Sequence, residues 1–237
     1  IPAAGKSERF KKENIFIPKY LYKIQSLKIR LIELINRYLP DKKKELIILN
    51  SKYINLINRK KFNLSILQKQ TTGQAETVFN HLLKNKKKSS IFLNSCDVFS
   101  IFDLNKFEKL KESSDIIIFV SKNSNQELSD NSYSWVEFKG NRFINIFIKR
   151  KPKKNLKILT GNFYFKNENI YKNCFINYPK SVKNEIYIDN IIKVAKKLHM
   201  KISVMEDDIY INLGTPQLIN DFIFWFNFFN FRKQNGY

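Results

Sequence analysis

Cysteine, glycine and proline are scarce in this sequence, and long apolar runs are absent. The only two cysteines, Cys96 and Cys174, are too few for a disulfide scaffold or a zinc cluster. Both lie in apolar runs, so we expect two buried free thiols. No run of about 18 apolar residues occurs, which excludes a transmembrane span. Without a signal peptide, the sequence predicts a reducing, cytoplasmic location.

Acidic residues are also few. The 237 residues include 21 Asp and Glu against 43 Lys and Arg, which gives a formal net charge of +22. Such an excess attracts polyanions, including nucleic acid, anionic membranes and phosphorylated small molecules. The lysines, however, are scattered in short clusters such as 42–44 and 86–88, without a nucleic-acid-binding motif. The abundance of Lys, Asn, Ile and Phe together is typical of an AT-rich coding sequence. We therefore interpret the charge as a solvated basic surface and expect no nucleic-acid partner.

The first half of the chain alternates strand-like and helix-like segments. Short runs rich in Ile, Leu and Phe are typical of buried strands in a mostly parallel sheet, and they occur at 45–50, 64–68, 90–95 and 115–121. Apolar residues at helical spacing predict helices at 26–39, 74–85 and 187–199. This order predicts βαβ units with helices on both faces of the sheet, and so an α/β fold.

The second half predicts a hairpin that turns at residues 139–141, followed by strands near 158–166 and 201–207. It closes with an aromatic segment at 222–231, which is too short to span a bilayer. A helix that caps the sheet is the first interpretation of this segment; a homo-oligomer face and a membrane-surface anchor are the alternatives. Because no linker or repeat occurs, we expect a single domain over residues 1–237. The chain begins at Ile1 rather than Met, so we also expect a truncated N-terminus.

The opening residues predict a site for an anion. Ile1 to Gly5 has the pattern of a strand that runs into a glycine turn, and small residues leave room for phosphates at Ala3, Ala4 and Ser7. Arg9 and Lys19 add cations. The stretch matches neither the P-loop nor the three-glycine dinucleotide motif, so an ordinary surface loop is the alternative.

Six short motifs then follow in order along nearly the whole chain: AAGKSERF…PKYL (3–21), TTGQAETV (71–78), NSCDVF (94–99), IKRKP (148–152), TGNFYF (160–165) and INLGTPQ (211–217). In this order and spacing the chain resembles the nucleotidyltransferases that make NDP-sugars. The resemblance implies a three-layer α/β/α Rossmann-like fold with a mixed, mostly parallel central sheet. It also implies transfer of NMP from an NTP to a phosphorylated sugar, with release of pyrophosphate, in surface polysaccharide synthesis.

The resemblance also implies roles for individual residues. Asp97 and Asn212 would hold Mg²⁺, while Arg9 and Lys19 would neutralise the β- and γ-phosphates. Residues implied to contact the nucleotide are Ala3, Ala4, Gly5, Lys6, Ser7, Gly73 and Gln74. Residues implied to contact the acceptor are Lys151, Arg150 and Gly161, with Lys149 as a rival for the phosphate-binding lysine. The nucleotide would bind to about residues 1–125 and the acceptor to about 126–237.

Three positions depart from the family pattern. Ser7 replaces a glycine, Arg150 replaces a glutamate, and Asn212 replaces an aspartate. The first two favour cytidylyl transfer to a non-sugar phosphate such as phosphocholine. The third is a mark of a non-catalytic nucleotide-binding relative. Asp207 and Asp208 are candidates to supply the missing charge, although we expect them in a solvated turn.

Overall fold

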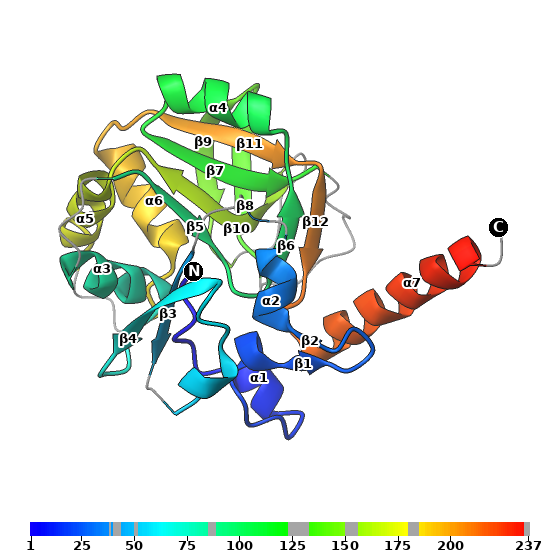
Figure 1. Cartoon of the computed structure of the whole chain (residues 1–237). Coiled ribbons are helices and arrows are strands. Elements are labelled where there is room, and N and C mark those ends of the chain that lie inside the picture. Colours follow the sequence, from blue (N-terminus) through cyan, green and yellow to red (C-terminus); the bar gives the residue numbers. More distant parts are fainter. Residues whose placement is uncertain are drawn as a thin grey trace.

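The computed structural model describes residues 1–37, 39, 44–49, 52–84, 89–122, 133–149, 156–179 and 185–234. Its central sheet has six strands in the order β5-β10-β7-β11-β9-β8, and β10 also pairs with β8 (Figure 1). The strands are β5 (Ile91–Asn94), β7 (Ile116–Ser121), β8 (Trp135–Lys139), β9 (Arg142–Phe147), β10 (Lys157–Phe165) and β11 (Ile202–Asp207). The α/β class and the mixed sheet were predicted from the sequence and are confirmed.

The sheet is less parallel than predicted. Strand β10 runs opposite to both β5 and β7, between which it lies, so two strands of the same direction are joined through antiparallel ladders. Among the described residues only β7–β11, β3–β4 and the bridge between Pro2 and Ile47 are parallel. Strand β9 is likewise antiparallel to β11, so two reversed strands, β10 and β9, replace parallel neighbours with antiparallel ones.

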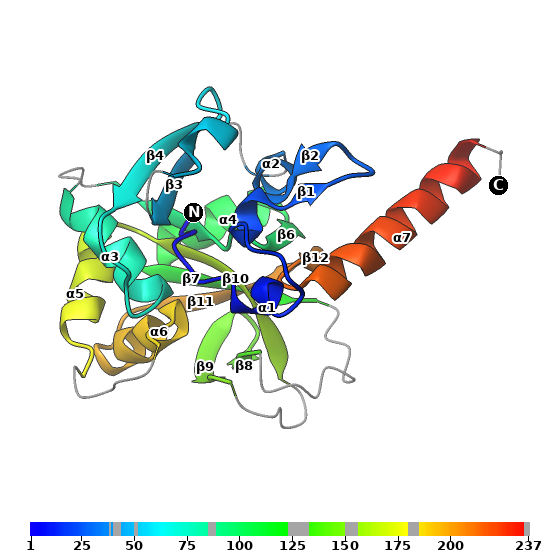
Figure 2. The same cartoon turned by 90° about the horizontal axis from the view of Figure 1, so that it is seen from below.

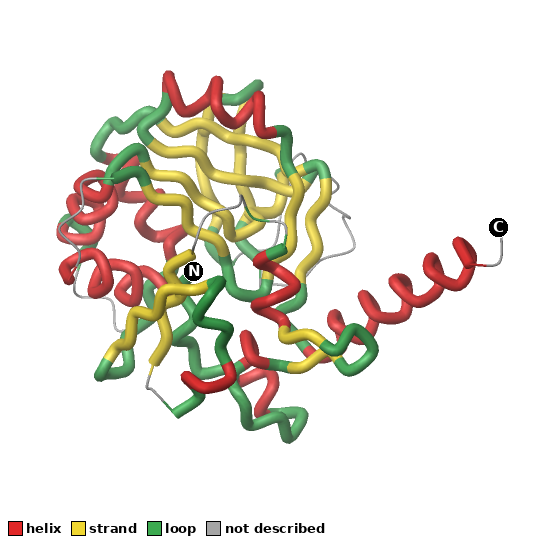
Figure 3. The backbone as a smooth tube through the Cα atoms, in the orientation of Figure 1, coloured by secondary structure: helices red, strands yellow, loops and turns green. Residues whose placement is uncertain are grey.

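Beside the central sheet, β3 (Lys44–Leu49) and β4 (Phe62–Leu67) form a separate parallel pair, visible in yellow in Figure 3. The first residues of the chain run along β3. The amide of Ala3 donates to the carbonyl of Ile47 at 2.7 Å, and the amide of Ile47 donates to the carbonyl of Ile1 at 2.9 Å. The expected strand that leads into the glycine turn is thus present as a short parallel contact.

Helices pack on both faces of the central sheet because alternate side chains of β7 point in opposite directions. Ile116, Ile118 and Val120 pack in one core with α3 (Gln74–Lys84), α5 (Glu168–Ile176) and α6 (Ile188–Lys197). On the other face, Ile117 and Phe119 pack against Phe107 of α4 (Leu104–Ser113). The helices predicted at 74–85 and 187–199 are confirmed.

The helix predicted at 26–39 is wrong in its first part. Residues 23–30 form a small hairpin of β1 (Lys23–Ile24) and β2 (Ile29–Arg30), and only α2 (Leu31–Asn36) is helical. Lys28 adopts a left-handed conformation with φ 53°, which turns the chain back. The buried residues Ile24, Leu31 and Leu34 therefore reach one core through a hairpin and a short helix.

Several short elements carry the site. Residues 8–11 form α1 (Glu8–Lys11), and single 3₁₀ turns cover Lys19–Leu21 and Ile54–Leu56. Strands β6 (Val98–Ile101) and β12 (Ile209–Asn212) form an antiparallel pair in which Asn212 lies opposite Val98. This ladder brings the chain after Asp97 next to the end of β12.

The closing helix α7 (Pro216–Gln234) does not cap the sheet, which corrects our first interpretation. It leaves the body as a free arm in both views (Figures 1 and 2). Ile219 is buried, but Phe224, Phe229 and Phe231 are 61–63% exposed. Both faces of the sheet already carry other helices, so no sheet face remains for α7. Within the described ranges, no helix combines the length and apolarity that a bilayer crossing requires.

Candidate active site

A cleft of about 920 Å³ opens between the N-terminal loops and the end of the central sheet. The side chains and main chain of both halves of the sequence line it. Of the residues singled out in the sequence, these line the cleft: Ala4, Gly5, Lys6, Ser7, Arg9, Lys19, Gly73, Gln74, Asp97, Lys149, Gly161 and Asn212. Ala3 is buried behind it. Arg150 and Lys151 lie outside the described residues.

The glycine turn presents its backbone to the cleft. A side chain at Gly5 would meet no atom within 4 Å, so the space beside it is open to a ligand. Ser7, immediately before α1, is left-handed with φ 56°, a conformation that glycine adopts most easily. Its hydroxyl accepts a hydrogen bond from the amide of Lys19 at 3.0 Å. The serine therefore accepts some backbone strain and ties the turn to the Lys19 segment.

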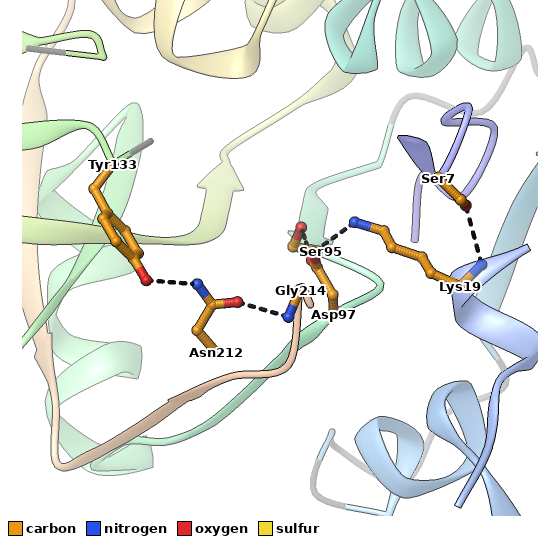
Figure 4. A network of polar contacts seen from close by, with 7 residues as sticks. All are labelled: Ser7, Lys19, Ser95, Asp97, Tyr133, Asn212 and Gly214. Carbon is orange, nitrogen blue, oxygen red and sulfur yellow. Dashed lines mark hydrogen bonds and ion pairs between the residues drawn. The ribbon is translucent and has the colours of Figure 1, made fainter. Parts of the chain in front are cut away.

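Lys19 and Asp97 form a close ion pair at the centre of the cleft (Figure 4). The Nζ of Lys19 donates to Oδ2 of Asp97 at 2.5 Å, and the hydroxyl of Ser95 donates to Oδ1 at 2.8 Å. Burial raises the pKa of Asp97, but the charge and hydrogen bond of Lys19 and the hydrogen bond of Ser95 hold it below its usual value. Burial also lowers the pKa of Lys19, and Asp97 more than reverses this effect. Both groups are therefore charged at neutral pH.

Asn212 lies beside this pair. Its Oδ1 accepts a hydrogen bond from the amide of Gly214 at 2.8 Å, and its Nδ2 donates to the hydroxyl of Tyr133 at 3.1 Å (Figure 4). A Cβ atom at Gly214 would lie 2.9 Å from both Asn212 Oδ1 and Asp97 Oδ2, and 3.7 Å from a guanidinium nitrogen of Arg9. Two hard oxygens and a forked cation thus surround the same point.

These oxygens fit a magnesium ion that is only partly held by protein. Mg²⁺ keeps several waters and is usually bound through one or two carboxylates together with substrate phosphates. No group of three or more His, Cys, Asp or Glu side chains suited to a metal occurs in the described part of the chain. Asp97 and Asn212 could therefore supply two of the ligands, with the remainder left to water and substrate.

The loop that leads into α3 lies next to the glycine turn. The side-chain amide of Gln70 donates to the carbonyl of Ala4 at 3.2 Å, which joins the two loops. Thr71 and Thr77 share a hydrogen bond of 2.7 Å, and the Thr77 hydroxyl donates to the carbonyl of Gly73 at 3.0 Å. Gln74 is the first residue of α3 and lines the cleft.

The backbone conformation and close packing of residue 161 require glycine, independently of any ligand. Its φ is +91°, and an added Cβ would lie 3.2 Å from the Cβ of Ser95. The ladder between β10 and β7 changes register around this position. The residue lines the cleft, but its close neighbour is the segment that carries Asp97. Any other side chain here would press on that segment.

Sequence reasoning missed six further residues that line the cleft: Tyr133, Ser134, Glu185, Tyr187, Asp189 and Tyr210. The hydroxyl of Tyr187 donates to Glu185 at 2.7 Å, and the ammonium of Lys149 lies 5.2 Å from the centre of the Tyr187 ring. The hydroxyl of Ser134 donates to Asp189. Burial raises the pKa of Asp189, and the Ser134 hydrogen bond opposes that effect. None of the six motifs covers these residues, which belong to three short stretches, 133–134, 185–189 and residue 210, that the fold brings to one cleft.

Asp207 contradicts the solvated turn that we expected. It is fully buried, and neither carboxylate oxygen has a hydrogen-bond partner in the described part of the protein. Burial raises its pKa to about 8, although the nearby hydroxyls of Thr160 and Ser100 act in the opposite direction. Asp208, by contrast, is exposed and pairs with Lys122 at 3.4 Å. Cys96 and Cys174 are both buried and free, as predicted.

Comparison with known proteins supports the fold. No family model and no curated protein matches the chain. Among solved structures, it resembles a nucleoside-diphosphate-sugar pyrophosphorylase from Vibrio cholerae RC9, with 20% identity, coverage of 93% of this chain and 98% of that one, and a TM-score of 0.74. An inositol-1-phosphate CTP transferase from T. maritima shares 19% identity over 92% of this chain and 89% of that one, with a TM-score of 0.69.

A UDP-glucose pyrophosphorylase solved with UDP-glucose matches with 15% identity, 92% coverage of this chain and 93% of that one, and a TM-score of 0.69. At these identities the likeness concerns the fold. The chain therefore has an α/β fold with a mixed sheet like that of these structures, and the candidate site residues that lie within the described ranges line one cleft, apart from the buried Ala3.

Proposed function

We propose that this protein is a nucleotidyltransferase that moves NMP from an NTP to a phosphorylated sugar and releases pyrophosphate. The observation that carries the proposal is the convergence of Arg9, Lys19, Asp97 and Asn212 beside an open glycine turn. A triphosphate needs backbone donors, cations and a hard-oxygen metal site within a few ångströms, and the cleft supplies all three. The likeness in fold to solved nucleotidyltransferases supports this proposal, and we also propose that the fold is of the three-layer α/β/α Rossmann-like type.

In the proposed reaction, an oxygen of the acceptor phosphate attacks the α-phosphorus of the NTP in line. The new P–O bond forms as the bond to the bridging oxygen of the β-phosphate breaks, and that electron pair leaves with pyrophosphate. The backbone around Gly5 and Ser7 would hold the phosphates. Arg9 and Lys19 would neutralise the charge that grows on the leaving group, because such steps depend mainly on position and electrostatics.

We propose Mg²⁺ as the cofactor, with Asp97 Oδ2 and Asn212 Oδ1 as its protein ligands. When bound, the ion would supply positive charge next to the phosphates. Lys19 now occupies Asp97 Oδ2 at 2.5 Å, so this lysine must turn from Asp97 toward the phosphates when nucleotide and metal enter. Asn212 would remain oriented by its bonds to Gly214 and Tyr133.

For the acceptor we propose the second half of the cleft, with Gly161 on its floor. Arg150 and Lys151 would bind the acceptor phosphate, since they follow directly after Lys149 at the cleft wall. Structures with this fold include proteins described as NDP-sugar and UDP-glucose pyrophosphorylases, which supports a sugar phosphate. A cytoplasmic step in surface polysaccharide synthesis is the setting that we propose.

A second candidate is cytidylyl transfer to a non-sugar phosphate. The aromatic and acidic side chains around Tyr187 in the cleft favour it. The Tyr187 ring already accepts a cation from Lys149, and the carboxylates of Glu185 and Asp189 lie beside it on the cleft wall. An aromatic face with carboxylates suits an ammonium group such as that of phosphocholine. The inositol-1-phosphate CTP transferase with this fold shows that CTP chemistry also occurs on it.

The free arm α7 supports a further proposal, a homo-oligomer. Six large aromatic side chains on this helix are 38–63% exposed: Phe224, Trp225, Phe226, Phe228, Phe229 and Phe231. We expect light scattering after gel filtration to give a mass above the 28.3 kDa of one chain. The pair Phe229→Ser and Phe231→Ser should lower this mass, whereas Phe16→Ser, at an aromatic residue elsewhere that is even more exposed, should not. A monomeric wild type would contradict this proposal.

The deciding experiment measures pyrophosphate release. The protein is incubated with Mg²⁺, each of the four common NTPs and dTTP, and either a sugar 1-phosphate or phosphocholine. Release with a sugar phosphate supports the main proposal, and release only with CTP and phosphocholine supports the second. If nucleotides bind but no pyrophosphate is released, the protein is a non-catalytic nucleotide-binding relative, as the replacement of an aspartate by Asn212 would indicate.

A further inference from the structure

The loop before α3 carries a glycine whose nearest neighbours belong to the other half of the cleft. A Cβ atom at Gly73 would lie 2.5 Å from the carbonyl oxygen of Ile186, 2.7 Å from its nitrogen and 2.9 Å from Cγ of Glu185. Real Cβ atoms do not approach so closely. Gly73 is therefore the point where the main chain of the segment 185–187 rests on the nucleotide-side loop.

Two main-chain hydrogen bonds hold the contact on either side of Gly73. The amide of Ile186 donates to the carbonyl of Thr72 at 3.2 Å, and the amide of Ala75 donates to the carbonyl of Ile186 at 3.0 Å. The segment that is held in this way carries Glu185 and Tyr187, which line the cleft, and it leads directly into α6 and Asp189.

Side-chain hydrogen bonds anchor the nucleotide-side loop. Thr72 donates from both its amide and its hydroxyl to the carboxylate of Glu76, at 2.5 and 2.7 Å. Thr77 donates to the carbonyl of Gly73 at 3.0 Å and shares a bond with Thr71. These bonds fix the loop to the first turn of its own helix. The segment 185–187 is anchored at its end by the bond from the amide of Tyr187 to Asn190 at 2.9 Å, so we expect residues 185 and 186 to move when the contact is forced apart.

We infer that Gly73 is a positioning residue for the acceptor end of the cleft: the loop that faces the nucleotide supports the segment that carries Glu185, Tyr187 and Asp189. This inference rests on the proposed function, and it assigns to Gly73 a task other than contact with the base. A methyl group at residue 73 displaces the acceptor segment by about 1 Å, and displacements of that size reduce reactivity by large factors.

The inference has a ligand-free test in hydrogen–deuterium exchange. In the wild type, the amide of Ile186 should exchange at least a hundredfold more slowly than an unstructured amide, because it is bonded to Thr72. In Gly73→Ala it should exchange at least tenfold faster than in the wild type. Ile186→Val keeps both main-chain bonds and should stay within threefold. An unprotected Ile186 amide in the wild type overturns the inference, even if the alanine variant fails to fold.

A kinetic test separates positioning from general damage. The pair used is glucose 1-phosphate with UTP or phosphocholine with CTP, whichever releases pyrophosphate. For Gly73→Ala we expect the KM for the acceptor to rise at least tenfold and the KM for the NTP to stay within threefold. Equal changes in both KM values would refute the inference. Absence of turnover in the wild type would instead refute the proposed function. The exchange experiment would still test the contact between Gly73 and the segment 185–187.

Discussion

The substitution Asp207→Asn should stabilise the protein, and by more as the pH rises. Asp207 is fully buried and its carboxylate has no hydrogen-bond partner within the described ranges, so burial favours the neutral form. Its pKa rises from 3.8 to about 8 in the folded protein. Between these two values the folded state retains a proton that the unfolded state has released, and stability therefore falls with increasing pH. Asparagine is neutral at every pH and removes this cost.

The size of the effect follows from the shift. One pKa unit corresponds to about 1.4 kcal/mol, so a shift of about four units corresponds to about 5 kcal/mol above pH 8. This value is an upper limit, because water entry and small movements relieve part of the cost of a buried charge. Between pH 5.5 and 8.0 we expect the stability gap between Asp207→Asn and the wild type to widen by about 1–3 kcal/mol.

The assay is urea denaturation of both proteins at pH 5.5, 6.5, 7.5 and 8.0, followed by circular dichroism. Asp208→Asn, at the adjacent exposed position, controls for the loss of one formal negative charge. The pH-dependent part of the gap should be clearly larger for Asp207→Asn. A gap that does not change with pH would show that Asp207 is ionised in the folded protein over this range, as it is in the unfolded chain, and the reasoning from burial would be refuted.

Three further substitutions test the centre of the cleft. Asp97→Ala should reduce pyrophosphate release at least a thousandfold with an unchanged fold by circular dichroism, because it removes the proposed metal ligand; retained activity would eliminate this role. Lys19→Met should also cost at least a hundredfold in kcat, yet the free protein should bind Mn²⁺ more tightly by electron paramagnetic resonance, since Asp97 Oδ2 loses its partner. Gly5→Ala should leave the Tm unchanged, because nothing lies within 4 Å of an added Cβ, but it should raise the KM for the NTP about tenfold; a lowered Tm would contradict this account.

The nucleotide side of the cleft was largely predictable from the sequence. Gly5, Ser7, Arg9 and Lys19 lie close together along the chain, and Asp97 directly follows an apolar strand. The N-terminal residues run along β3, in a strand pair separate from the central sheet that holds β5, so the order and spacing of the motifs, and not a shared parallel sheet, predicted that these residues meet. The left-handed Ser7 was also marked, because the serine stands where the motif has a glycine.

The acceptor side was not predictable in the same way. Tyr133, Glu185 and Tyr187 lie outside the six motifs, and the fold brings the segment before β8 and the segment before α6 to the same cleft. The sequence likewise did not reveal why residue 73 must be glycine, because this requirement depends on a main-chain contact with a segment more than a hundred residues away. Helical spacing misled at 26–30, where a hairpin places the same apolar side chains in the same core. The position of α7 was missed because its own pattern does not reveal that other helices already occupy the sheet.

The ion pair between Lys19 and Asp97 has a consequence for how the protein encounters metal in solution. The carboxylate of Asp97 is already paired with the ammonium group of Lys19. The cleft should therefore bind a free divalent ion only weakly. A nucleotide that arrives already bound to a divalent metal ion brings phosphates to which the Lys19 ammonium can move. The metal ion of that complex can then take the place of the ammonium at Asp97. Reaction velocity should therefore track the concentration of the preformed metal–nucleotide complex, and titrating additional uncomplexed metal should leave it flat.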